Sequence, residues 1–369
     1  MLKGLWFVTL VACLSALLAF APSTAAASER SATARHRDIR LSSDGETASI
    51  TLDVLTYNIE GVPKRAGRKR QLREIGARLD AVRKAGDGPD LILFQEMFSS
   101  DARVAVQSAS YPQLVTGPSR TQRRSLPAWG DRKGHKWRKG EWGLHVVGSG
   151  LAIASVYPLR DHASEPFSRR ACAGLDCLSN KGALFASVSI PGVPDGLDLF
   201  NTHMNAQSAS RVPSRRHMPA HHAQVRELSD FMAQRRDPQR PVILGGDFNM
   251  RGSATRFETF HASQPLQLVH QYCREEARLC DVEMSWDGDA PWMDTQDLQL
   301  FRSGARVQIR PVRVQAMFDG RPDSPKLSDH DGFRVVYELS WSVGAKLADA
   351  GAPGADAPPV DDAAPANRP

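Results

Sequence analysis

The chain has 369 residues, of which 41% are hydrophobic and 24% charged, and its formal net charge is +6. This composition is typical of a globular protein, and it excludes a wholly disordered chain, a collagen-like fibre and a mini-protein held by disulfides. Only one long apolar run is present, so a protein with several membrane spans is also excluded. The positive charge favours an anionic partner, either nucleic acid or a phosphate-bearing surface.

The N-terminus has the features of a secretory signal peptide. A basic residue precedes a mostly apolar run over residues 5–20, and small residues follow up to Ala27. We expect cleavage near Ala27, so that residues 1–27 are removed and the protein is exported, either to the periplasm or out of the cell. The run is short for a membrane span. Residues 10–13 also resemble a bacterial lipoprotein cleavage box, which makes a lipid anchor at Cys13 the alternative.

We expect one folded domain between two poorly ordered ends. Residues 28–47 are predicted to form a polar leader, and residues 48–343 the folded domain. Residues 344–369 form a tail rich in Ala, Pro, Gly and Asp, which cannot bury enough apolar surface to fold. We also expect the protein to be a monomer.

The folded region alternates between strand and helix patterns. Runs rich in apolar and β-branched residues predict strands, and apolar residues at helical spacing predict helices. Interleaved patterns of this kind predict an α/β or α+β sandwich. In chain order we expect strands at residues 52–59, 90–97, 150–156, 182–190, 196–203, 241–248 and 332–341, and helices at residues 71–84 and 222–235.

Four cysteines remain if the signal peptide is removed. An even number in an exported protein predicts disulfides, and four cysteines allow three pairings. We favour the local pairs Cys172–Cys177 and Cys273–Cys280, each of which would stiffen a short loop. A zinc site is the alternative, although these spacings do not match the usual two-residue ligand knuckles.

A segment over residues 119–142 combines basic side chains with tryptophan. It contains eight Lys or Arg residues and two acidic ones, with Trp129, Trp137 and Trp142 among them. One interpretation is a solvated surface insertion. The other is a platform for phosphate-rich material, in which the basic side chains supply charge and Trp stacks on bases or lies at a membrane interface.

Polar side chains able to bind a metal or transfer a proton stand at six places in the chain, each interpreted as the end of an apolar strand. We expect them to meet, since sites in α/β proteins are built at strand ends. Carboxylate and amide oxygens suit Mg²⁺ or Mn²⁺ rather than zinc, and two histidines supply proton transfer near neutral pH. Together they predict metal-assisted hydrolysis of a phosphate ester. The residues are Asn58, Glu96, His203, Asp247, Asn249, Asp297, Asp329 and His330.

The order of these residues resembles that of the endonuclease/exonuclease/phosphatase superfamily, which has the fold of deoxyribonuclease I. The resemblance extends from Asn58 to His330, which is most of the predicted domain. It implies a four-layer α/β/β/α sandwich of the α+β class. It also implies that the site lies at one end of the paired sheets.

Within this superfamily, residues 174–185 are similar to the P-loop-like segment of neutral sphingomyelinases. In that family an Asp and a Lys stand five residues apart before a glycine, as Asp176 and Lys181 do here. Residues 201–206 also resemble a stretch of that family. By this resemblance Lys181 would contact the substrate phosphate and be held by Asp176, with Asn180 alongside.

The resemblance also implies a catalytic arrangement around one divalent cation. Glu96 would bind Mg²⁺, or alternatively Mn²⁺, with Asn58 beside it and Asp329 contributing. The cation would polarise a phosphate oxygen. His330 would act as general base on the attacking water, and Asp297 would orient its ring as in a triad.

Three further residues would act on the reacting phosphate. Asp247 and Asn249 would position water and stabilise the charged oxygens. His203 would donate to the phosphate or protonate the leaving alkoxide. The reaction implied is hydrolysis of sphingomyelin to ceramide and phosphocholine at the surface of a phospholipid membrane.

Three alternatives stay open. A secreted nuclease of the same fold would use the basic segment directly, with nucleic acid as its partner. A phosphatase acting on phosphoinositides or sugar phosphates would be expected to carry a dense basic cluster beside the motifs, and the sequence has none there. A binding module without activity would have no need for both histidines together with the acidic residues.

Overall fold

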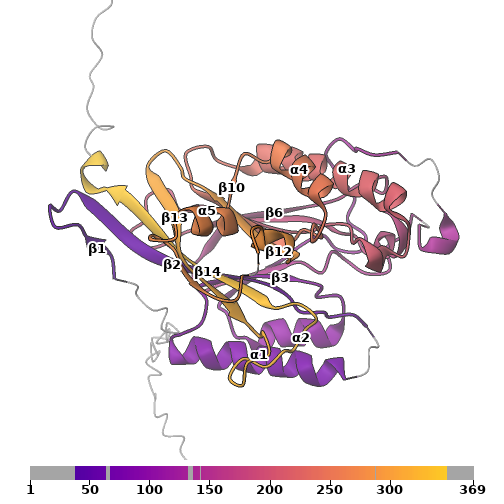
Figure 1. Cartoon of the computed structure of the whole chain (residues 1–369), viewed down its shortest axis with the longest axis horizontal. Helices are drawn as coiled ribbons and strands as arrows, with labels where there is room; N and C mark the ends of the chain where they lie inside the picture. The colour runs from indigo at the N-terminus through magenta and orange to yellow at the C-terminus, as the bar shows by residue number, and fades with distance from the viewer. Residues whose placement is uncertain (1–37, 64–66, 132–135, 142, 287, 347–369) are drawn as a thin grey trace, which may run out of the picture. The chain divides into compact units, whose positions relative to one another are not determined.

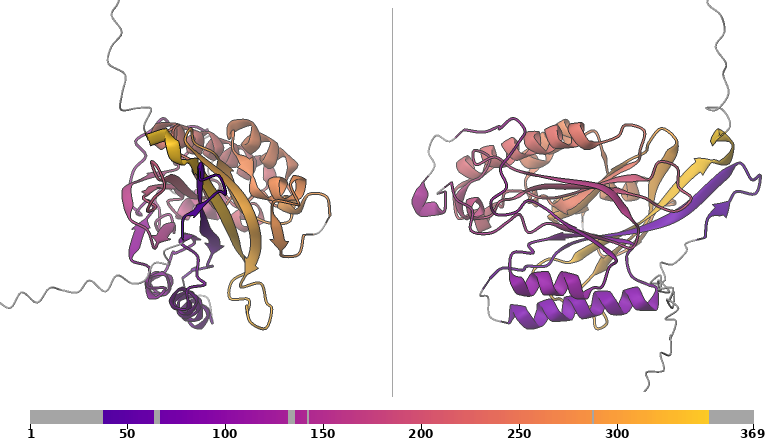
Figure 2. Two further views of the ribbon diagram at one scale, coloured as in Figure 1. Left: turned by 90° about the vertical axis from the view of Figure 1, so that its left-hand side faces the viewer. Right: turned by 180° about the vertical axis from the view of Figure 1, so that it is seen from behind.

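The structure is a computed structural model that describes residues 38–63, 67–131, 136–141, 143–286 and 288–346 (Figure 1). Within these residues two β-sheets pack face to face, and helices cover their outer faces, as the two views of Figure 2 also show. The predicted four-layer α/β/β/α sandwich is therefore confirmed. The predicted signal peptide, Cys13, Trp142 and most of the predicted tail lie outside the described residues.

The first sheet is mixed and has eight strands in the order β11-β13-β14-β2-β3-β5-β4, with β1 paired to β2. Strands β2 and β3 are parallel, whereas β14 runs antiparallel to β2. The strands are β1 (Arg40–Leu41), β2 (Thr47–Asn58), β3 (Leu91–Gln95), β4 (Gln113–Thr116), β5 (Ala152–Ser155), β11 (Asp281–Glu283), β13 (Val307–Met317) and β14 (Gly332–Ser342).

The second sheet has six strands in the order β10-β12-β9-β8-β7-β6. Its central strands β8 and β9 are parallel, and β12 runs antiparallel to β9. The strands are β6 (Leu159–Pro166), β7 (Gly182–Val188), β8 (Leu197–His203), β9 (Val242–Asp247), β10 (Gln267–Leu268) and β12 (Asp297–Arg302).

Five α-helices are found in the described part of the chain, and four of them form the outer layers. In Figure 1, α1 and α2 lie below the first sheet, and α3 and α4 lie above the second. Short 3₁₀ turns occur at Trp137–Lys139 (η1), Gly174–Leu178 (η2), Ser208–Ser210 (η3), Pro291–Met293 (η4) and Val343–Lys346 (η5). The α-helices are α1 (Arg68–Ala85), α2 (Ser100–Ser108), α3 (Ser214–Arg235), α4 (Ala254–Ser263) and α5 (Val269–Glu275).

Helix α1 shows how the sequence forms an outer layer. Leu72, Ile75 and Leu79 recur at helical spacing, are fully buried and pack against the first sheet. The helix ends at Gly86, whose left-handed conformation (φ 81°) lets its backbone N–H donate to the carbonyl of Arg83. The apolar face therefore decides which side of the helix meets the sheet, and glycine decides where the helix stops.

The two sheets are held together by an apolar core and by buried amides. Leu93 of β3 and Leu199 of β8 belong to the same cluster between the sheets. The buried Gln95 donates from Nε2 to Oδ1 of Asn201 across the interface at 2.8 Å. Gln299 of β12 donates to the carbonyl of Val54 in β2 at 3.0 Å. These paired amides fix how one sheet lies on the other, because a shift would leave buried polar groups without partners.

The predicted elements are present, but several boundaries differ. The helix expected from residue 222 begins at Ser214, and Pro219 lies inside it. The predicted leader, residues 28–47, ends too late, because β1 (Arg40–Leu41) already pairs with β2. Elements that are short or half exposed did not stand out as apolar runs, and the sequence did not predict them. These elements are β1, β4, β6, β10, β11, β12, β13, α2, α4 and α5.

Both favoured disulfides are confirmed, Cys172–Cys177 and Cys273–Cys280. The sulfurs are bonded to each other, so the alternative of a zinc site formed by these cysteines is wrong. None of the helices among the described residues combines the length and the apolar character needed to cross a membrane.

We expect Gln299→Leu to lower the free energy of unfolding by about 1–3 kcal/mol, because it leaves the buried hydroxyl of Tyr337 without its partner and removes two contacts to the first sheet. Denaturant unfolding measures this change. The matched control is Gln267→Leu on the exposed face of β10, which should change stability little. Equal effects of the two substitutions would contradict the proposed importance of the amides between the sheets.

Candidate active site

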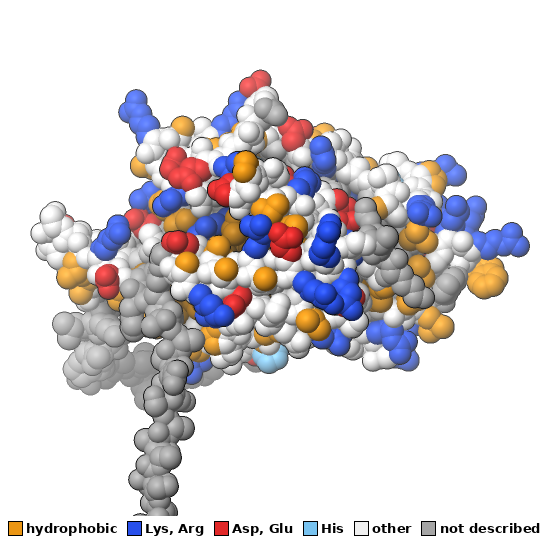
Figure 3. All heavy atoms as spheres, turned by 90° about the horizontal axis from the view of Figure 1, so that it is seen from below, with side chains coloured by type: hydrophobic (Ala, Val, Ile, Leu, Met, Phe, Trp, Pro, Cys, Tyr) orange, Lys and Arg blue, Asp and Glu red, His pale blue; other side chains and the backbone are white. Residues whose placement is uncertain are grey.

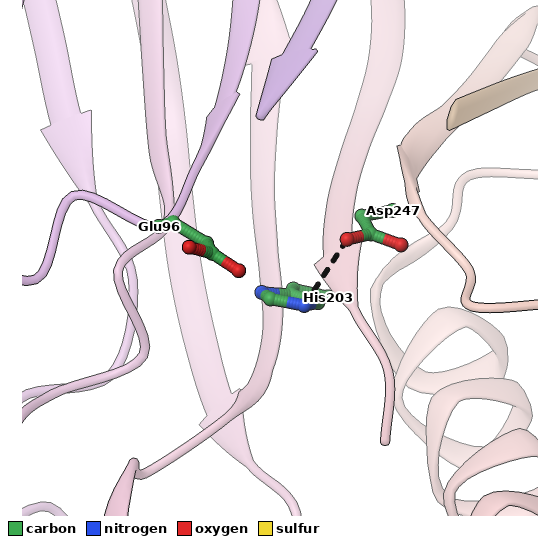
Figure 4. Close-up of side chains that lie close together, drawn as sticks. All are labelled: Glu96, His203 and Asp247. Carbon is green, nitrogen blue, oxygen red and sulfur yellow. Dashed lines mark ion pairs between the residues drawn. The ribbon is translucent and has the colours of Figure 1, made fainter. Parts of the chain in front are cut away.

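Most of the predicted polar residues meet at one end of the paired sheets. Asn58 ends β2 and Glu96 follows β3, while His203 and Asp247 end the parallel strands β8 and β9. Because the carboxyl ends of parallel neighbours lie at the same edge, four side chains from two sheets come together there. Figure 4 shows Glu96, His203 and Asp247 side by side at this edge.

Two of the predicted strand-end positions are instead strand beginnings. Asp297 is the first residue of β12, and His330 precedes β14. They reach the same edge because β12 and β14 run antiparallel to their neighbours β9 and β2, which brings their beginnings beside the ends of those strands. The prediction that the side chains meet is confirmed, but for these two residues the stated position in the strand was wrong.

His330 is the centre of a hydrogen-bonded group that joins the two sheets. Its Nδ1 lies 2.6 Å from Oδ2 of Asp297, and its Nε2 lies 3.5 Å from Nδ2 of Asn58. The same Asn58 amide donates to Oδ2 of Asp247 at 2.9 Å. With Nδ1 bonded to a carboxylate, the ring is fixed so that Nε2 faces the cluster.

The negative charge of these carboxylates determines the pKa of His330. Burial alone would lower the pKa of His330, but the neighbouring Asp297 and Asp247 raise it to about 10. Burial raises the pKa of Asp247 to about 7, although His330 opposes the shift. In this state His330 is an imidazolium that balances the carboxylates, so its own proton must leave before it can act as a base.

A second chain of contacts runs through Lys181. Its Nζ lies 3.1 Å from Asp176, 2.9 Å from Nε2 of His203 and 2.9 Å from the carbonyl of Met204. Nε2 of His203 also lies 3.2 Å from Oδ2 of Asp247. Burial and the charge of Lys181 hold the pKa of His203 well below its usual range, so this imidazole is neutral. The predicted pairing of Asp176 with Lys181 is present.

Two groups of residues could hold a metal ion. In each group, ligand atoms lie within 4.8 Å of one another: Glu96, His203 and Asp247 form one, and Asp247, Asp297 and His330 form the other. Burial raises the pKa of Glu96, and Lys181 opposes that shift only in part. One oxygen of Asp297, Oδ1, is buried with no hydrogen-bond partner among the described residues. Buried carboxylates whose charge is incompletely balanced fit a hard divalent cation.

Glu96 is held in place by an unusual backbone conformation. It has a positive φ of 60°, which is uncommon for a residue with a side chain. Gly61 passes close to it, since a Cβ at that position would stand 2.3 Å from the carbonyl oxygen of Glu96. The turn therefore depends on the neighbouring chain having no side chain there.

Asn249 supports the site from behind. Its left-handed backbone (φ 52°) lets its N–H donate to Oδ1 of Asp247 at 3.0 Å, and its side chain donates to the carbonyl of Met204. It orients Asp247 and the segment after His203. This contact differs from the predicted one, in which the Asn249 side chain itself stabilises the phosphate.

Two predicted residues are not brought into the cluster. The amide of Asn180 donates to the backbone carbonyls of Ser119 and Gln122 at 2.7 and 2.9 Å, so it is committed to holding that segment. The side chain of Asp329 is 60% exposed, lies 4.0 Å from Nε2 of His330 and belongs to neither potential metal group. The geometry therefore does not support a phosphate contact by Asn180 or a metal contact by Asp329.

The sequence did not single out Arg256, which holds two loops of the site. This fully buried arginine donates from Nη1 to the carbonyls of Asn205 and Asn249, both at 2.7 Å, and from Nη2 to Nδ1 of His217. It thereby ties the residues after β8 to those after β9. A single arginine in the pattern of α4 gives no signal of this role, because its partners are backbone carbonyls distant in sequence.

A cavity of about 320 Å³ opens beside His330. Trp286 stacks on His270, with ring centroids 5.2 Å apart, and His270 stacks on Phe333 at 4.4 Å. Burial lowers the pKa of His270 to about 3, so its ring is neutral. Four carboxylates and three basic side chains line the cavity. They are Asp294, Asp297, Asp329 and Asp331, with Arg251, Lys326 and His330.

Comparison with known proteins agrees with this architecture. The model of the Endonuclease/Exonuclease/phosphatase family matches residues 55–330. Among solved structures, sphingomyelinase C from Streptomyces griseocarneus is 18% identical over 78% of this chain and 99% of its own, with a TM-score of 0.54. A variant of beta toxin from Staphylococcus aureus with bound magnesium ions is 15% identical over 79% and 99%, with a TM-score of 0.50.

A DNA-bound protein shares the fold as well. TDP2 from D. rerio, complexed with a single-strand DNA product, is 13% identical over 78% of this chain and 98% of its own, with a TM-score of 0.51. No curated protein matches the sequence significantly. At such identities the solved structures show a common fold and leave the substrate open.

We expect Arg256→Met to lower the free energy of unfolding by about 2–5 kcal/mol, since it leaves buried carbonyls without a donor. Thermal and denaturant unfolding measure the loss. Arg215→Met, an exposed arginine of α3, is the matched control and should change stability by less than about 0.5 kcal/mol. If both variants were as stable as the native protein, Arg256 would not tie the two loops.

Proposed function

The chain belongs to the endonuclease/exonuclease/phosphatase family, and we propose that within it the protein is an exported, Mg²⁺-dependent sphingomyelin phosphodiesterase. Water cleaves the bond between phosphorus and the ceramide oxygen, which gives ceramide and phosphocholine. One observation supports the assignment as a hydrolase. The Asp297–His330 pair lies at the same edge of the sheets as Glu96, Asp247 and Lys181.

The residues at this edge fit a divalent cation. Glu96 and Asp247 would hold it, with Asn58 beside them, and Mg²⁺ is favoured over Mn²⁺ by the magnesium ions that the beta toxin variant binds. When bound, the cation supplies Lewis-acid stabilisation of the phosphate charge. Its positive charge would also offset the carboxylates that hold the pKa of His330 high, and would bring the imidazole toward the neutral form.

His330 takes the proton from the attacking water at Nε2. Its Nδ1 is bound to Asp297, which keeps the proton on that nitrogen and leaves Nε2 free to accept. The imidazolium formed in this way is stabilised by the same carboxylate. Asp297 therefore orients the base and then balances its charge.

Lys181 places a positive charge where the phosphate oxygens become more negative. It is held by Asp176 and by the carbonyl of Met204, so it is positioned before the substrate arrives. His203 is neutral beside it and provides a ring nitrogen within hydrogen-bonding distance of Lys181. This pair can pass a proton to the leaving alkoxide, because each partner is already in contact with the other.

The residues that line the cavity beside His330 favour a substrate with a cationic headgroup. A quaternary ammonium is attracted to aromatic faces and to carboxylates, and Trp286, Asp294 and Asp329 supply both. A DNA strand would bring further phosphates against these carboxylates, which repel them. The competing nuclease function draws its support from the basic segment and from the DNA-bound relative of the same fold.

Export and the monomeric state belong to the same proposal. The two disulfides support an oxidising compartment outside the cytoplasm. The monomer remains part of the proposal because the contacts that form the site need no residue from a partner subunit.

We expect Glu96→Gln to reduce the turnover of sphingomyelin by at least about 10²-fold, because it removes a negative ligand while keeping the size of the side chain. The assay measures phosphocholine release with Mg²⁺, with Mn²⁺ and with EDTA, and EDTA should abolish it. Phosphatidylcholine and duplex DNA are assayed in parallel. Glu258→Gln, an exposed glutamate of α4, serves as control and should retain full activity.

Two results would count against this proposal. Cleavage of DNA without turnover of sphingomyelin would assign the protein to the nucleases of this fold. Turnover that persists in EDTA and in Glu96→Gln would remove the metal from the reaction.

A second substitution tests the headgroup cavity. We expect Trp286→Ala to raise KM for sphingomyelin by about tenfold, in line with losing a cation–π contact, while hydrolysis of bis(4-nitrophenyl) phosphate, which has no cation, stays unchanged. Equal losses on both substrates would mean that Trp286 supports the site as a whole and does not recognise choline.

A further inference from the structure

An apolar patch is exposed near the phosphate-contacting residues. It consists of four side chains with large exposed fractions: Trp137 at 71%, Leu144 at 67%, Val146 at 58% and Leu175 at 36%. Figure 3 shows hydrophobic side chains among Lys and Arg at the right-hand end of the molecule. Large apolar side chains held in water next to a reaction site mark a surface that another apolar phase covers.

The patch is one surface because its segments are joined to each other. The N–H of Val146 donates to the carbonyl of Leu178 at 2.6 Å, and Val147 and Ser179 form a β-bridge. The segment with Leu144 and Val146 therefore lies beside η2, which carries Leu175.

A buried carboxylate attaches the third segment of the patch. Glu141 accepts a hydrogen bond from the N–H of Gly174 at 2.7 Å, accepts another from the N–H of Lys136, and pairs with Arg216 of α3. Trp137 lies within the loop that Glu141 closes. The exposed Trp is thus presented by a braced turn, so less conformational entropy is lost when it binds a surface.

The patch leads directly to the reaction site. Turn η2 contains both Leu175 of the patch and Asp176, which holds Lys181. Asp176 also accepts a hydrogen bond from the N–H of Ala206, in the loop after His203. A surface that covers Leu175 therefore lies one residue from the group that positions the phosphate contact.

Basic side chains surround the patch. Lys136, Arg138 and Lys139 flank Trp137 and are exposed. The charge of Arg169 acts on the pKa of His145, which stands between Leu144 and Val146, and the exposed Arg120 lines a pocket together with Val146. The acidic residues beside the patch are already paired, Glu141 with Arg216 and Asp176 with Lys181. The net field around the patch therefore favours an anionic surface.

We propose that this patch docks on the surface of a phospholipid bilayer that contains anionic lipids. Three of its four side chains are aliphatic, and they gain from contact with acyl chains but cannot stack on nucleobases. Trp137 adds the ring that prefers the membrane interface. This inference rests on the proposed function, because docking here would bring the lipid headgroup to Lys181. The binding itself needs no hydrolysis.

The test separates docking from catalysis. Binding of the full chain is measured by cosedimentation with vesicles of phosphatidylcholine alone or with about 30% phosphatidylglycerol, in EDTA and without sphingomyelin. The variant is Trp137→Ser combined with Leu144→Ser. The matched control is Leu41→Ser, which is 63% exposed on β1, at the end of β2 opposite Asn58. Hydrolysis of bis(4-nitrophenyl) phosphate and circular dichroism report whether each variant is folded.

We expect the native chain and Leu41→Ser to bind anionic vesicles at least about tenfold more tightly than neutral ones, and the double variant to lose at least about tenfold of this affinity. Hydrolysis of the soluble substrate should be the same in all three. Unchanged vesicle binding by the double variant would overturn the proposal. Vesicle binding without sphingomyelin turnover would support the docking surface and overturn the proposed function instead.

Discussion

The site depends on hydrogen bonds that cross from one sheet to the other. Asn58 of the first sheet donates to Asp247 of the second at 2.9 Å, and Asp297 of the second sheet holds His330, which leads into the first, at 2.6 Å. Each sheet alone presents only half of the reacting groups. The buried amide of Gln299, which reaches Val54 across the interface, therefore matters to chemistry, because it sets how far one half can slide past the other.

The meeting of the two sheets also couples the charge of the proposed metal ligands to that of the proposed base. Glu96 and Asp247 come from different sheets and are brought together in a buried space, which raises the pKa of both carboxyls. His330 compensates for this by holding its proton. In the proposed function, a divalent cation bound by Glu96 and Asp247 would balance part of this charge, and His330 would then give up its proton more readily. The same carboxylates would therefore hold the cation and set the pKa of the base.

The sequence predicted those site residues whose position depends on where a strand ends. Apolar runs predicted β2, β3, β8 and β9, and polar residues at their ends had to share an edge. The sequence could not predict the roles of Asn180 and Arg256. Each of these side chains binds backbone carbonyls that come near it only in the folded chain. Strands β12 and β13 were missed because polar residues interrupt their apolar patterns. In the almost wholly buried β12 these are Asp297 and Gln299, whereas β13 is half exposed.

The two surfaces beside the site have opposite character, and this constrains how a lipid headgroup can lie between them. The cavity next to His330 offers aromatic rings and four carboxylates, whereas the patch next to Lys181 is mainly aliphatic and is flanked by basic side chains. For the proposed substrate, a zwitterionic headgroup with its cation in the cavity would place its phosphate between His330 and Lys181, and its acyl chains toward the patch. Water activated at His330 would then attack from the side opposite the leaving alkoxide, which would depart toward Lys181 and the proposed docking surface. In-line displacement and retention of a lipid product at the bilayer would therefore require the same orientation.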